Sequence, residues 1–257
     1  MNTKVSIKKL TTFKELEDIQ ILEKAIWGME PLPVHQTFTV AKNGGLILGA
    51  FIDHKMVGFS YGFPGFQDGR TYLCSHMLGI DPDYQKQGIG RLLKEKQREA
   101  ALELGYDLIT WTFDPLLSVN AYLNLHHLKA IVAKYTENLY GEMDDQLNRG
   151  IPSDRFTVEW WIGSELGRQN YETVVRNEDN TLVDHSETKD LRHREDWFIP
   201  IPADFQRLKL ENPDSALEWR LKTRRIFQEL FRAGFVGADI RRSGDFSYYH
   251  FIKKDKL

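Results

Sequence analysis

The segment Gln85-Lys86-Gln87-Gly88-Ile89-Gly90 constrains this chain more than any other. It lies between an apolar, β-prone run over residues 71–80 and a longer run with helical periodicity. Glycine has no Cβ atom, so the backbone of such a turn can come close to a ligand. The first amides of the helix lack an intrahelical partner and the helix dipole favours negative charge, which predicts a cradle for a phosphate-bearing ligand. The alternative interpretation is that these residues form only a tight strand-to-helix turn and bind no ligand.

The helix after this turn is predicted to end near Gly105, which supplies a stop signal. The apolar stripe expected to face the core consists of Ile89, Leu92, Leu93, Ala100 and Leu104. The polar side expected to face solvent consists of Lys94, Glu95, Arg98 and Glu99. This pattern is typical of an amphipathic helix at the surface of a globular protein.

Apolar, β-prone runs predict strands around 5–10, 46–52, 56–61, 71–80, 108–113, 130–135 and 156–162. Helices are predicted from a capping box at Thr12 to a stop at Gly28, over 34–41 and over 120–128. A turn is expected at 65–69. The element order β-α-α-β-β-β-α-β-α-β-β predicts an α+β fold with a mainly antiparallel sheet, not a doubly wound one.

The character of the chain changes after the last of these strands. A charged, turn-rich loop is predicted over about 177–196, with a short hairpin near 173–183. A second long helix is predicted to begin at Asn212, whose side chain can cap it before Pro213. Closing strands are expected at 239–241 and 247–252.

Charge and composition disfavour several classes of function. The 257 residues hold 34 Lys and Arg against 37 Asp and Glu, a net charge of −3 without the basic footprint of a nucleic-acid-binding protein. No run approaches the about 18 apolar residues of a membrane span, and the N-terminus does not resemble a signal peptide. The single cysteine, Cys74, excludes an intrachain disulfide, and no residue cluster has metal-ligand spacing. A cytoplasmic protein without a metal is therefore expected.

Two familiar phosphate-binding motifs do not fit the turn at 85–90. A dinucleotide-binding fold requires a third glycine and a place after the first strand, whereas this turn follows about the fourth strand. A Walker motif requires Gly-Lys followed by Ser or Thr, and Arg91 follows Gly90 here.

The stretch from Tyr84 to Leu93 resembles the acyl-CoA-binding motif of the GNAT N-acyltransferases, and the similarity extends from Val5 to about Trp161. This resemblance implies a mixed, mainly antiparallel twisted sheet flanked by helices, in which the fourth and fifth strands splay apart. Pantetheine is then expected to pair with the exposed strand edge at Met77, Leu78, Gly79 and Ile80. The pyrophosphate is expected at Gln85, Lys86, Gln87, Gly88, Ile89, Gly90 and Arg91. Further expected contacts with the cofactor are Asn120 and Asn124, although Asn124 could instead cap local backbone.

Longer motifs resemble a bacterial GNAT subgroup that includes relatives linked to N-succinylation of D-amino acids. They are Ile109-Thr110-Trp111-Thr112-Phe113-Asp114-Pro115-Leu116, Asn120-Ala121, Asn124-Leu125, Tyr140-Gly141-Glu142-Met143, Pro152-Ser153-Asp154-Arg155-Phe156 and Val158-Glu159-Trp160. The resemblance continues beyond them, so we expect an acyltransferase core over 1–162 and a native C-terminal α/β extension over 163–257, packed on or near the core. It implies acetyl-CoA or succinyl-CoA as the co-substrate.

Acyl transfer to an amine requires a neutral amine, a held thioester and stabilisation of the oxyanion. A backbone amide near Leu78 or Gly79 is a candidate oxyanion donor. His76 is the first candidate for the base, because its ordinary pKa of about 6.5 suits the task, and Glu159 is the second. The alternatives are a hydrogen-bonded core histidine and a solvated strand acid.

Two further positions concern the leaving group and the acceptor. Many GNAT enzymes have a Tyr that protonates the leaving thiolate, and Leu125 stands at that place here, so Tyr122, Ser118 or water would have to act instead. Arg155 is a candidate for binding a carboxylate of the acceptor or of the acyl group, because its guanidinium can bind bidentately. The alternative for Arg155 is a surface ion pair with Asp154 or Glu159.

Together these inferences predict an enzyme that moves an acetyl or succinyl group from acyl-CoA to the amine of a small molecule, amino acids included, by direct attack on the thioester. The alternative is a non-catalytic acyl-CoA-binding or sensing protein, which the missing Tyr leaves open. No nucleic-acid or membrane partner is expected, and a homodimer is one option. The extension over 163–257 could cap the acceptor site, form a separate subdomain or form a dimer interface.

Overall fold

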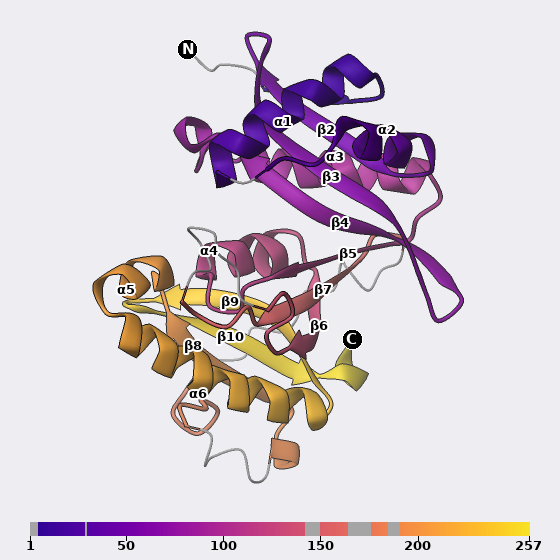
Figure 1. The fold of residues 1–257 in the computed structure, drawn as a ribbon. Helices are drawn as coiled ribbons and strands as arrows, with labels where there is room; N and C mark the ends of the chain where they lie inside the picture. The colour runs from indigo at the N-terminus through magenta and orange to yellow at the C-terminus, as the bar shows by residue number, and fades with distance from the viewer. Residues whose placement is uncertain (1–4, 29, 142–149, 164–175, 185–190) are drawn as a thin grey trace. The chain divides into compact units, whose positions relative to one another are not determined.

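The computed structural model describes residues 5–28, 30–141, 150–163, 176–184 and 191–257. The chain divides into two compact units, one of residues 1–111 with 161–163 and one of residues 112–160 with 164–257. Each unit has its own strands and helices (Figure 1). The predicted α+β class with a mainly antiparallel arrangement of strands is confirmed. The predicted division into an acyltransferase core and an extension stays a prediction.

The first unit contains the elements from the N-terminus to the fifth strand. Its strands are β1 (Ser6–Lys9), β2 (Leu46–Ile52), β3 (Lys55–Gln67), β4 (Arg70–Ile80) and most of β5 (Leu108–Phe113). Its helices are α1 (Phe13–Trp27), α2 (Val34–Lys42) and α3 (Ile89–Glu103), with a short 3₁₀ turn at Pro82–Tyr84. Strands β1 to β4 form an antiparallel meander in chain order, and β5 joins β4 in parallel.

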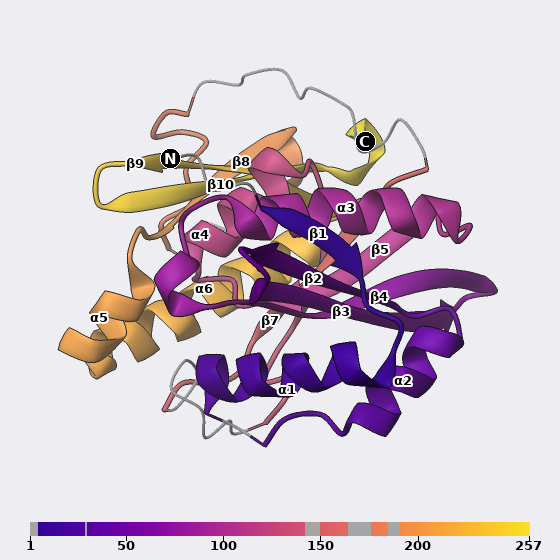
Figure 2. The ribbon, with the colours of Figure 1, turned by 90° about the horizontal axis from the view of Figure 1, so that it is seen from above.

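Helices cover both faces of the first unit's sheet. Helix α3 lies on one face, and α1 and α2 lie on the other (Figure 2). Helix α1 begins with the predicted capping box: the Thr12 hydroxyl accepts a hydrogen bond from the Glu15 amide at 3.3 Å, and the Glu15 carboxylate accepts one from the Thr12 amide at 3.0 Å. The core beneath α1 and α2 includes Leu16, Ile19, Leu22, Phe59 and Tyr61.

The reversal between β3 and β4 is tighter than the sequence predicts. Strand β3 continues to Gln67, so the turn expected at 65–69 shrinks to Asp68 and Gly69. Both residues have positive φ, 51° and 76°, as a two-residue type I′ hairpin requires. Pro64 obscured this part of β3 in the sequence, because proline is rare inside strands.

The buried face of α3 differs from the prediction. Leu92 and Leu104 are 41% and 42% exposed, whereas Lys94 is only 2% exposed and Gln97 is fully buried. The expectation that Lys94 faces solvent is therefore wrong. Hydrophobic periodicity places apolar residues inside, and it does not recognise a polar side chain that finds partners in the core.

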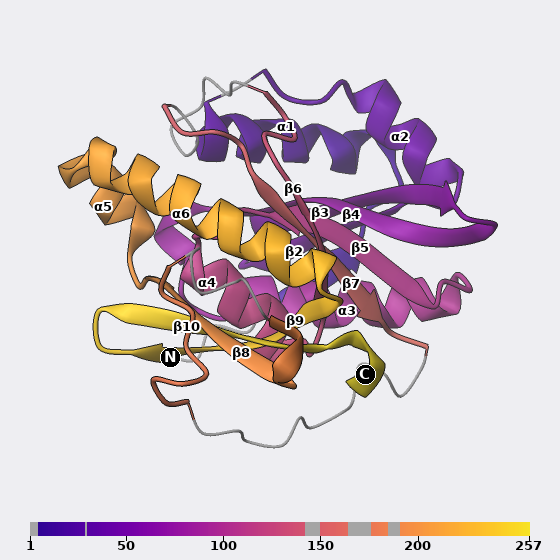
Figure 3. The same ribbon diagram turned by 90° about the horizontal axis from the view of Figure 1, so that it is seen from below.

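The second unit contains the remaining elements. Its strands are β6 (Ile131–Thr136), β7 (Arg155–Trp161), β8 (Asp196–Pro202), β9 (Phe235–Ser243) and β10 (Phe246–Lys253), in the spatial order β7-β6-β9-β10-β8. Its helices are α4 (Ser118–Ala121), a π-helical stretch (Tyr122–His127), α5 (Phe205–Glu211) and α6 (Pro213–Arg232). Helix α6 packs against β6 and β9 (Figure 3). The aromatic core of this unit includes Phe156, Phe227, Tyr249 and Phe251.

Two elements of the second unit, β8 and α5, have no counterpart in the sequence-based prediction. Pro200 and Pro202 hide β8, which tolerates them because it ends the strand order beside β10 and its other edge carries an isolated bridge from Phe198 to Thr181. The predicted cap of α6 is confirmed, since the Asn212 side chain accepts a hydrogen bond from the Ser215 amide at 3.1 Å. The hairpin predicted near 173–183 is wrong for the described residues 176–183, which contain a turn and an isolated bridge from Thr181 to Phe198, and residues 173–175 lie outside the described part of the chain.

Candidate functional site

Strands β4 and β5 are paired over only a short stretch. Their register pairs are Leu73 with Ile109 and Cys74 with Thr110, and no further pair follows within the described residues. The edge of β4 over Met77–Ile80 therefore has no β5 partner, in agreement with the splaying that the family resemblance implies. Such an edge can hydrogen-bond an extended ligand in the way that it would bind an added strand.

A β-bulge lies in β4 beside this edge. Tyr61 of β3 pairs with Met77, but the next residue, Gly62, pairs with Ser75. His76 is thus the extra residue of the bulge and has no register partner on β3. Bulges bend a strand and re-aim side chains, and they are over-represented next to active sites.

The turn between β4 and α3 leaves backbone amides available for an anion. Gly88 forms the N-cap of α3 with a φ of 81°, and Lys86 also has a positive φ of 61°. No side chain caps this helix end, and its first backbone bond runs from the Leu92 amide to the Gly88 carbonyl at 3.1 Å. The three amides between these residues lack an intrahelical partner. Arg91, at the same end, forms an exposed ion pair with Glu95 at 2.7 Å.

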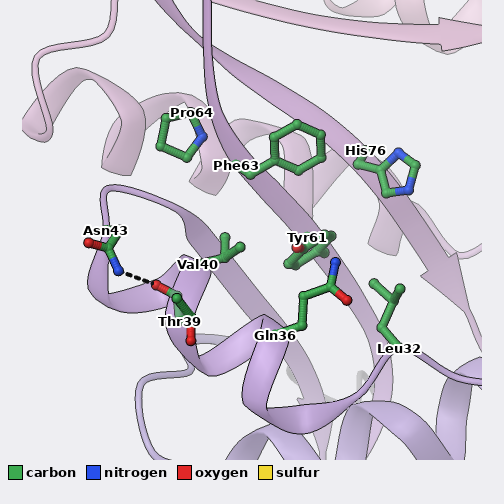
Figure 4. A pocket seen from close by; sticks show the side chains of 9 residues that line it. All are labelled: Leu32, Gln36, Thr39, Val40, Asn43, Tyr61, Phe63, Pro64 and His76. Carbon is green, nitrogen blue, oxygen red and sulfur yellow. Dashed lines mark hydrogen bonds between the residues drawn. The ribbon is translucent and has the colours of Figure 1, made fainter.

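A cavity of about 610 Å³ opens beside His76, between α2, the loop before it, and strands β3 and β4 (Figure 4). The imidazole contacts the rings of Tyr61 and Phe63, at centroid distances of 6.2 Å and 5.7 Å. Although the His76 side chain is exposed, desolvation by the groups around its ring lowers its pKa below the ordinary value of 6.5. The imidazole is therefore neutral at pH 7 and can accept a proton.

Among the residues that the structure describes, the walls of this cavity carry no acidic side chain and no Lys or Arg. Leu32, Val40, Pro64 and the two aromatic residues of β3 form apolar walls. Polar groups come from Gln36, Thr39 and Asn43, of which Gln36 points into the space (Figure 4). The Asn43 amide is already engaged, since it donates to the Thr39 carbonyl at 2.7 Å.

Glu23 of α1 supports a wall of the cavity, and the sequence analysis missed it. Glu23 is 3% exposed and accepts a hydrogen bond from the Leu32 amide at 2.8 Å. Gln20 holds the same residue, because its side-chain amide donates to the Leu32 carbonyl at 2.7 Å. Burial raises the pKa of the Glu23 carboxyl above 4.5. Its position one turn after Ile19, on the apolar stripe of α1, is the signal that could have revealed it.

Lys94 is a second buried group that the sequence analysis missed. Its ammonium donates to the Ser75 hydroxyl at 2.8 Å and to the Gln97 side-chain carbonyl at 3.2 Å. The nitrogen lies 3.6 Å from the centroid of the Trp111 ring. Burial lowers the pKa of Lys94 to about 7. Nothing in the local sequence distinguishes Lys94 from the exposed lysine two residues later, Lys96.

The predicted site residues fall into both units. His76 and the segments 77–80 and 85–91 share the first unit, whereas Glu159, Asn120, Asn124 and Arg155 belong to the second. Glu159 of β7 lies opposite Ile131 of β6. Asn120 is exposed on α4, and Asn124 is buried in the π-helical stretch. The roles assigned to these residues stay predictions.

Arg155 is buried within the second unit, with 7% of its surface exposed. One of its terminal nitrogens donates to the Asp154 backbone carbonyl at 2.9 Å and lies 4.0 Å from the Asp114 carboxylate. Its guanidinium lies 5.4 Å from the Tyr140 ring centroid. The alternative of a surface ion pair for Arg155 is therefore wrong. Sequence could not show this burial, because the alternation of apolar and polar residues over 156–160 places Arg155 on the same face of β7 as Thr157 and Glu159.

The candidates for protonating the leaving thiolate also lie in the second unit. Leu125 is fully buried, so this position presents only an alkyl group to the core. Tyr122 is 40% exposed, and its ring stacks on His126 with the centroids 4.6 Å apart. The Ser118 hydroxyl donates to the Ala203 carbonyl at 2.6 Å. Of these side chains, Tyr122 is the more accessible to a ligand.

No helix among the described residues is long and apolar enough to cross a membrane. In the same part of the chain, no group of three or more His, Cys, Asp and Glu side chains could hold a metal ion.

Four features together define the fold of an acyl-CoA-dependent acyltransferase. They are the antiparallel meander, the bulge in its fourth strand, the separation of β4 from a parallel β5 and the glycine turn that leads into α3. Residues 13–126 match the model of the acetyltransferase (GNAT) family. This match covers less than half of the chain, and it supports an acyl-CoA-dependent N-acyltransferase of the GNAT type. No curated protein matches the sequence.

Solved structures share this fold at low sequence identity. The ribosomal-protein-S18-alanine N-acetyltransferase of Escherichia coli aligns with a TM-score of 0.50 and 19% identity, over 67% of this chain and all of that one. The yncA protein of Salmonella typhimurium, solved with its cofactor acetyl-CoA, aligns with a TM-score of 0.51 and 13% identity, over 68% and 99%. A GNAT acetyltransferase of Streptococcus pneumoniae aligns with a TM-score of 0.50 and 14% identity, over 61% and 98%. At these identities the likeness concerns the fold alone.

Proposed function

We propose that this protein transfers an acyl group from acyl-CoA to the amine of a small molecule by direct attack on the thioester. The observation that carries the proposal is the edge of β4, which runs unpaired from the bulge at His76 to the turn that begins α3. One end of this edge meets the cavity and the other meets the free amides of the helix. A donor cofactor and an acceptor can therefore be held along one strand.

The β4 edge and the turn fit the two chemical parts of coenzyme A. The backbone over Met77–Ile80 offers hydrogen bonds to the amides of pantetheine. The free amides at the start of α3, with Lys86 and Arg91, offer donors and positive charge to the pyrophosphate. Asn120 and Asn124 are proposed as further contacts. When bound, acyl-CoA supplies the activated acyl group, with acetyl-CoA or succinyl-CoA as the donor.

The proposed base is His76, acting directly or through a water molecule. It takes a proton from the ammonium of the acceptor, and the amine nitrogen then attacks the thioester carbonyl carbon. The carbon–sulfur bond breaks, and the leaving thiolate takes up a proton from Tyr122 or from water. The nitrogen loses its second proton to water or to the Tyr122 phenolate, which gives the neutral amide and restores Tyr122. A backbone amide near Leu78 or Gly79 would donate to the oxyanion. Glu159 is the second candidate for the base.

The cavity beside His76 is proposed to receive the body of the acceptor. Within the described residues, its lining combines apolar walls with uncharged polar groups and offers no ion-pair partner. A charged body would lose its hydration there without compensation, whereas an aliphatic or aromatic body would gain from burial. We therefore propose an amine on an apolar or aromatic body as the acceptor. Arg155, in the second unit, is proposed independently of this cavity as the group that would bind a carboxylate of the acceptor or of the acyl group.

Thiol release tests this proposal against the sensor alternative. Purified protein would be incubated with acetyl-CoA or succinyl-CoA and a panel of amines, including phenethylamine, D- and L-phenylalanine, putrescine and glycine. The proposal predicts amine-dependent release of CoA, fastest with the amines that have apolar bodies. Tight CoA binding without amine-dependent release would instead favour the sensing protein. Fastest turnover with putrescine or glycine would contradict the assignment of the cavity.

A further inference from the structure

Lys94 contacts both strands at the point where they separate. The last register pair of β4 and β5 is Cys74 with Thr110, so Ser75 and Trp111 are the first residues beyond it on the two strands. The Lys94 nitrogen donates to the Ser75 hydroxyl at 2.8 Å and lies 3.6 Å from the Trp111 ring centroid. One side chain of α3 therefore links the two strands of the fork.

The environment of Lys94 is unfavourable for a charged group. The side chain is 2% exposed, and no carboxylate lies within ion-pair distance of it among the described residues. Its neighbours include a hydroxyl, an amide, an indole ring and the Cys74 thiol, which compensate only partly for the hydration that the ammonium loses. Methionine has a similar length and would fill the same space without this cost.

A purely structural role does not account for such a group. The buried face of α3 is mainly apolar, with Ile89, Leu93 and Ala101 buried beside the one buried amide of Gln97, so an apolar side chain at position 94 would pack with them. The amine instead sets a distance and a direction between Ser75 and Trp111. These two residues stand where the gap between β4 and β5 begins, so the amine fixes the spacing of the strands at that point.

We propose that Lys94 is a positioning residue for acyl-CoA, whose buried amine holds Ser75 of β4 and Trp111 of β5 apart at a fixed spacing and so keeps the β4 edge available to pantetheine. This inference rests on the proposed function, because it assigns pantetheine to that edge. Lys94 acts through the two strands and does not itself need to touch the ligand. The stability of the fold and the affinity for CoA are then separable properties of this position.

The test compares Lys94→Met with wild-type protein and with the control Lys96→Met, an exposed lysine of the same helix. Calorimetry gives the affinity for CoA, initial rates give kcat and KM for acyl-CoA and for the amine, and thermal unfolding gives Tm. We expect Lys94→Met to weaken CoA binding and to raise KM for acyl-CoA by about tenfold, with KM for the amine unchanged and Tm equal or higher. Lys96→Met should leave all four quantities near their wild-type values.

A double-mutant cycle with Ser75→Ala separates positioning from a general packing effect. If the amine acts through Ser75, the Lys94→Met and Ser75→Ala double variant binds CoA no more weakly than Lys94→Met alone. Additive losses would overturn the inference, and so would wild-type CoA affinity in Lys94→Met. A loss of CoA affinity that only follows a fall in Tm would also overturn it. If the wild-type protein itself binds no CoA, the proposed function fails together with this inference. If wild-type protein binds CoA and Lys94→Met binds it equally well, only the positioning role of Lys94 fails.

Discussion

The ring centroids of His76 and Phe63 lie 5.7 Å apart, with an angle of 57° between their planes. This contact places the imidazole against an aromatic wall of the cavity and contributes to the desolvation that lowers its pKa. The same contact therefore shapes the acceptor cavity and keeps the proposed base neutral at physiological pH.

Replacing His76 by Ala is expected to lower kcat/KM by about 100-fold, the range that loss of a general base produces. Because desolvation favours the neutral imidazole, the acid limb of the wild-type kcat/KM profile should lie below pH 6.5. His76→Ala should lose this limb. The measurement is the pH dependence of thiol release, with His54→Asn on an exposed turn as the control. If His76→Ala keeps wild-type rates and Glu159→Gln turns over slowly, the general base is Glu159 and not His76.

Gly88→Ala should weaken CoA binding. With a φ of 81°, position 88 lies in the left-handed region, where a Cβ atom costs about 1 kcal/mol or more. The chain can relieve this strain by rotating the first peptides of α3, which turns their amides away from the pyrophosphate. Gly69→Ala at the tip of the β3–β4 hairpin is the matched control, since its φ is 76° and it has similarly open surroundings. Both variants should lose stability in urea unfolding, and only Gly88→Ala should lose CoA affinity. Equal affinities in the two variants would argue against the cradle.

Gln36→Glu should change the choice of acceptor. A carboxylate that points into an uncharged cavity repels an acceptor carboxylate and attracts a second ammonium. At a separation of about 4 Å in a solvated cavity the effect is about 1 kcal/mol, or about fivefold in KM. We therefore expect KM to rise about fivefold for an amino acid and to fall by a similar factor for a diamine. Gln67→Glu, on the exposed end of β3, is the control. Unchanged ratios between the amines would show that the acceptor body binds elsewhere.

Glu23→Gln should stabilise the protein at neutral pH and not at low pH. The folded state raises the pKa of Glu23 above 4.5, so ionisation costs more in the folded than in the unfolded chain. Wild-type stability is therefore reduced as the pH rises from 4.5 through the folded pKa, and below 4.5 the penalty is absent. Glutamine can still accept the hydrogen bond from the Leu32 amide. Urea unfolding at both pH values checks this, with the exposed Glu17→Gln as the control. A variant less stable than wild type at pH 7 would contradict the prediction.

Local signals in the sequence predicted most of the first unit correctly. The capping box at Thr12 and the glycine at 88 act within a few residues, so their sequence pattern and their structure coincide. The resemblance to the GNAT family then supplied the parting of β4 from β5. The cap at Asn212 is of the same local kind.

The features that sequence did not predict depend on contacts between distant residues. Lys94 becomes a core residue because Ser75 and Trp111, far from it in the chain, supply its partners. The bulge at His76 arises from the register between β3 and β4, and the sequence of either strand alone does not determine that register. Strand β8 carries two prolines and needs β10 beside it to become a strand.

The bulge at His76 has a consequence for how this protein can change. In a regular strand ladder, each residue pairs with a residue of the neighbouring strand. A substituted side chain must then pack beside its cross-strand neighbour as well as contact the ligand. His76 occupies a position that the β3 ladder skips, between the pairs Gly62–Ser75 and Tyr61–Met77. A substitution there leaves both pairs in place. The residue closest to the proposed chemistry can thus be exchanged while the sheet that carries it stays in register.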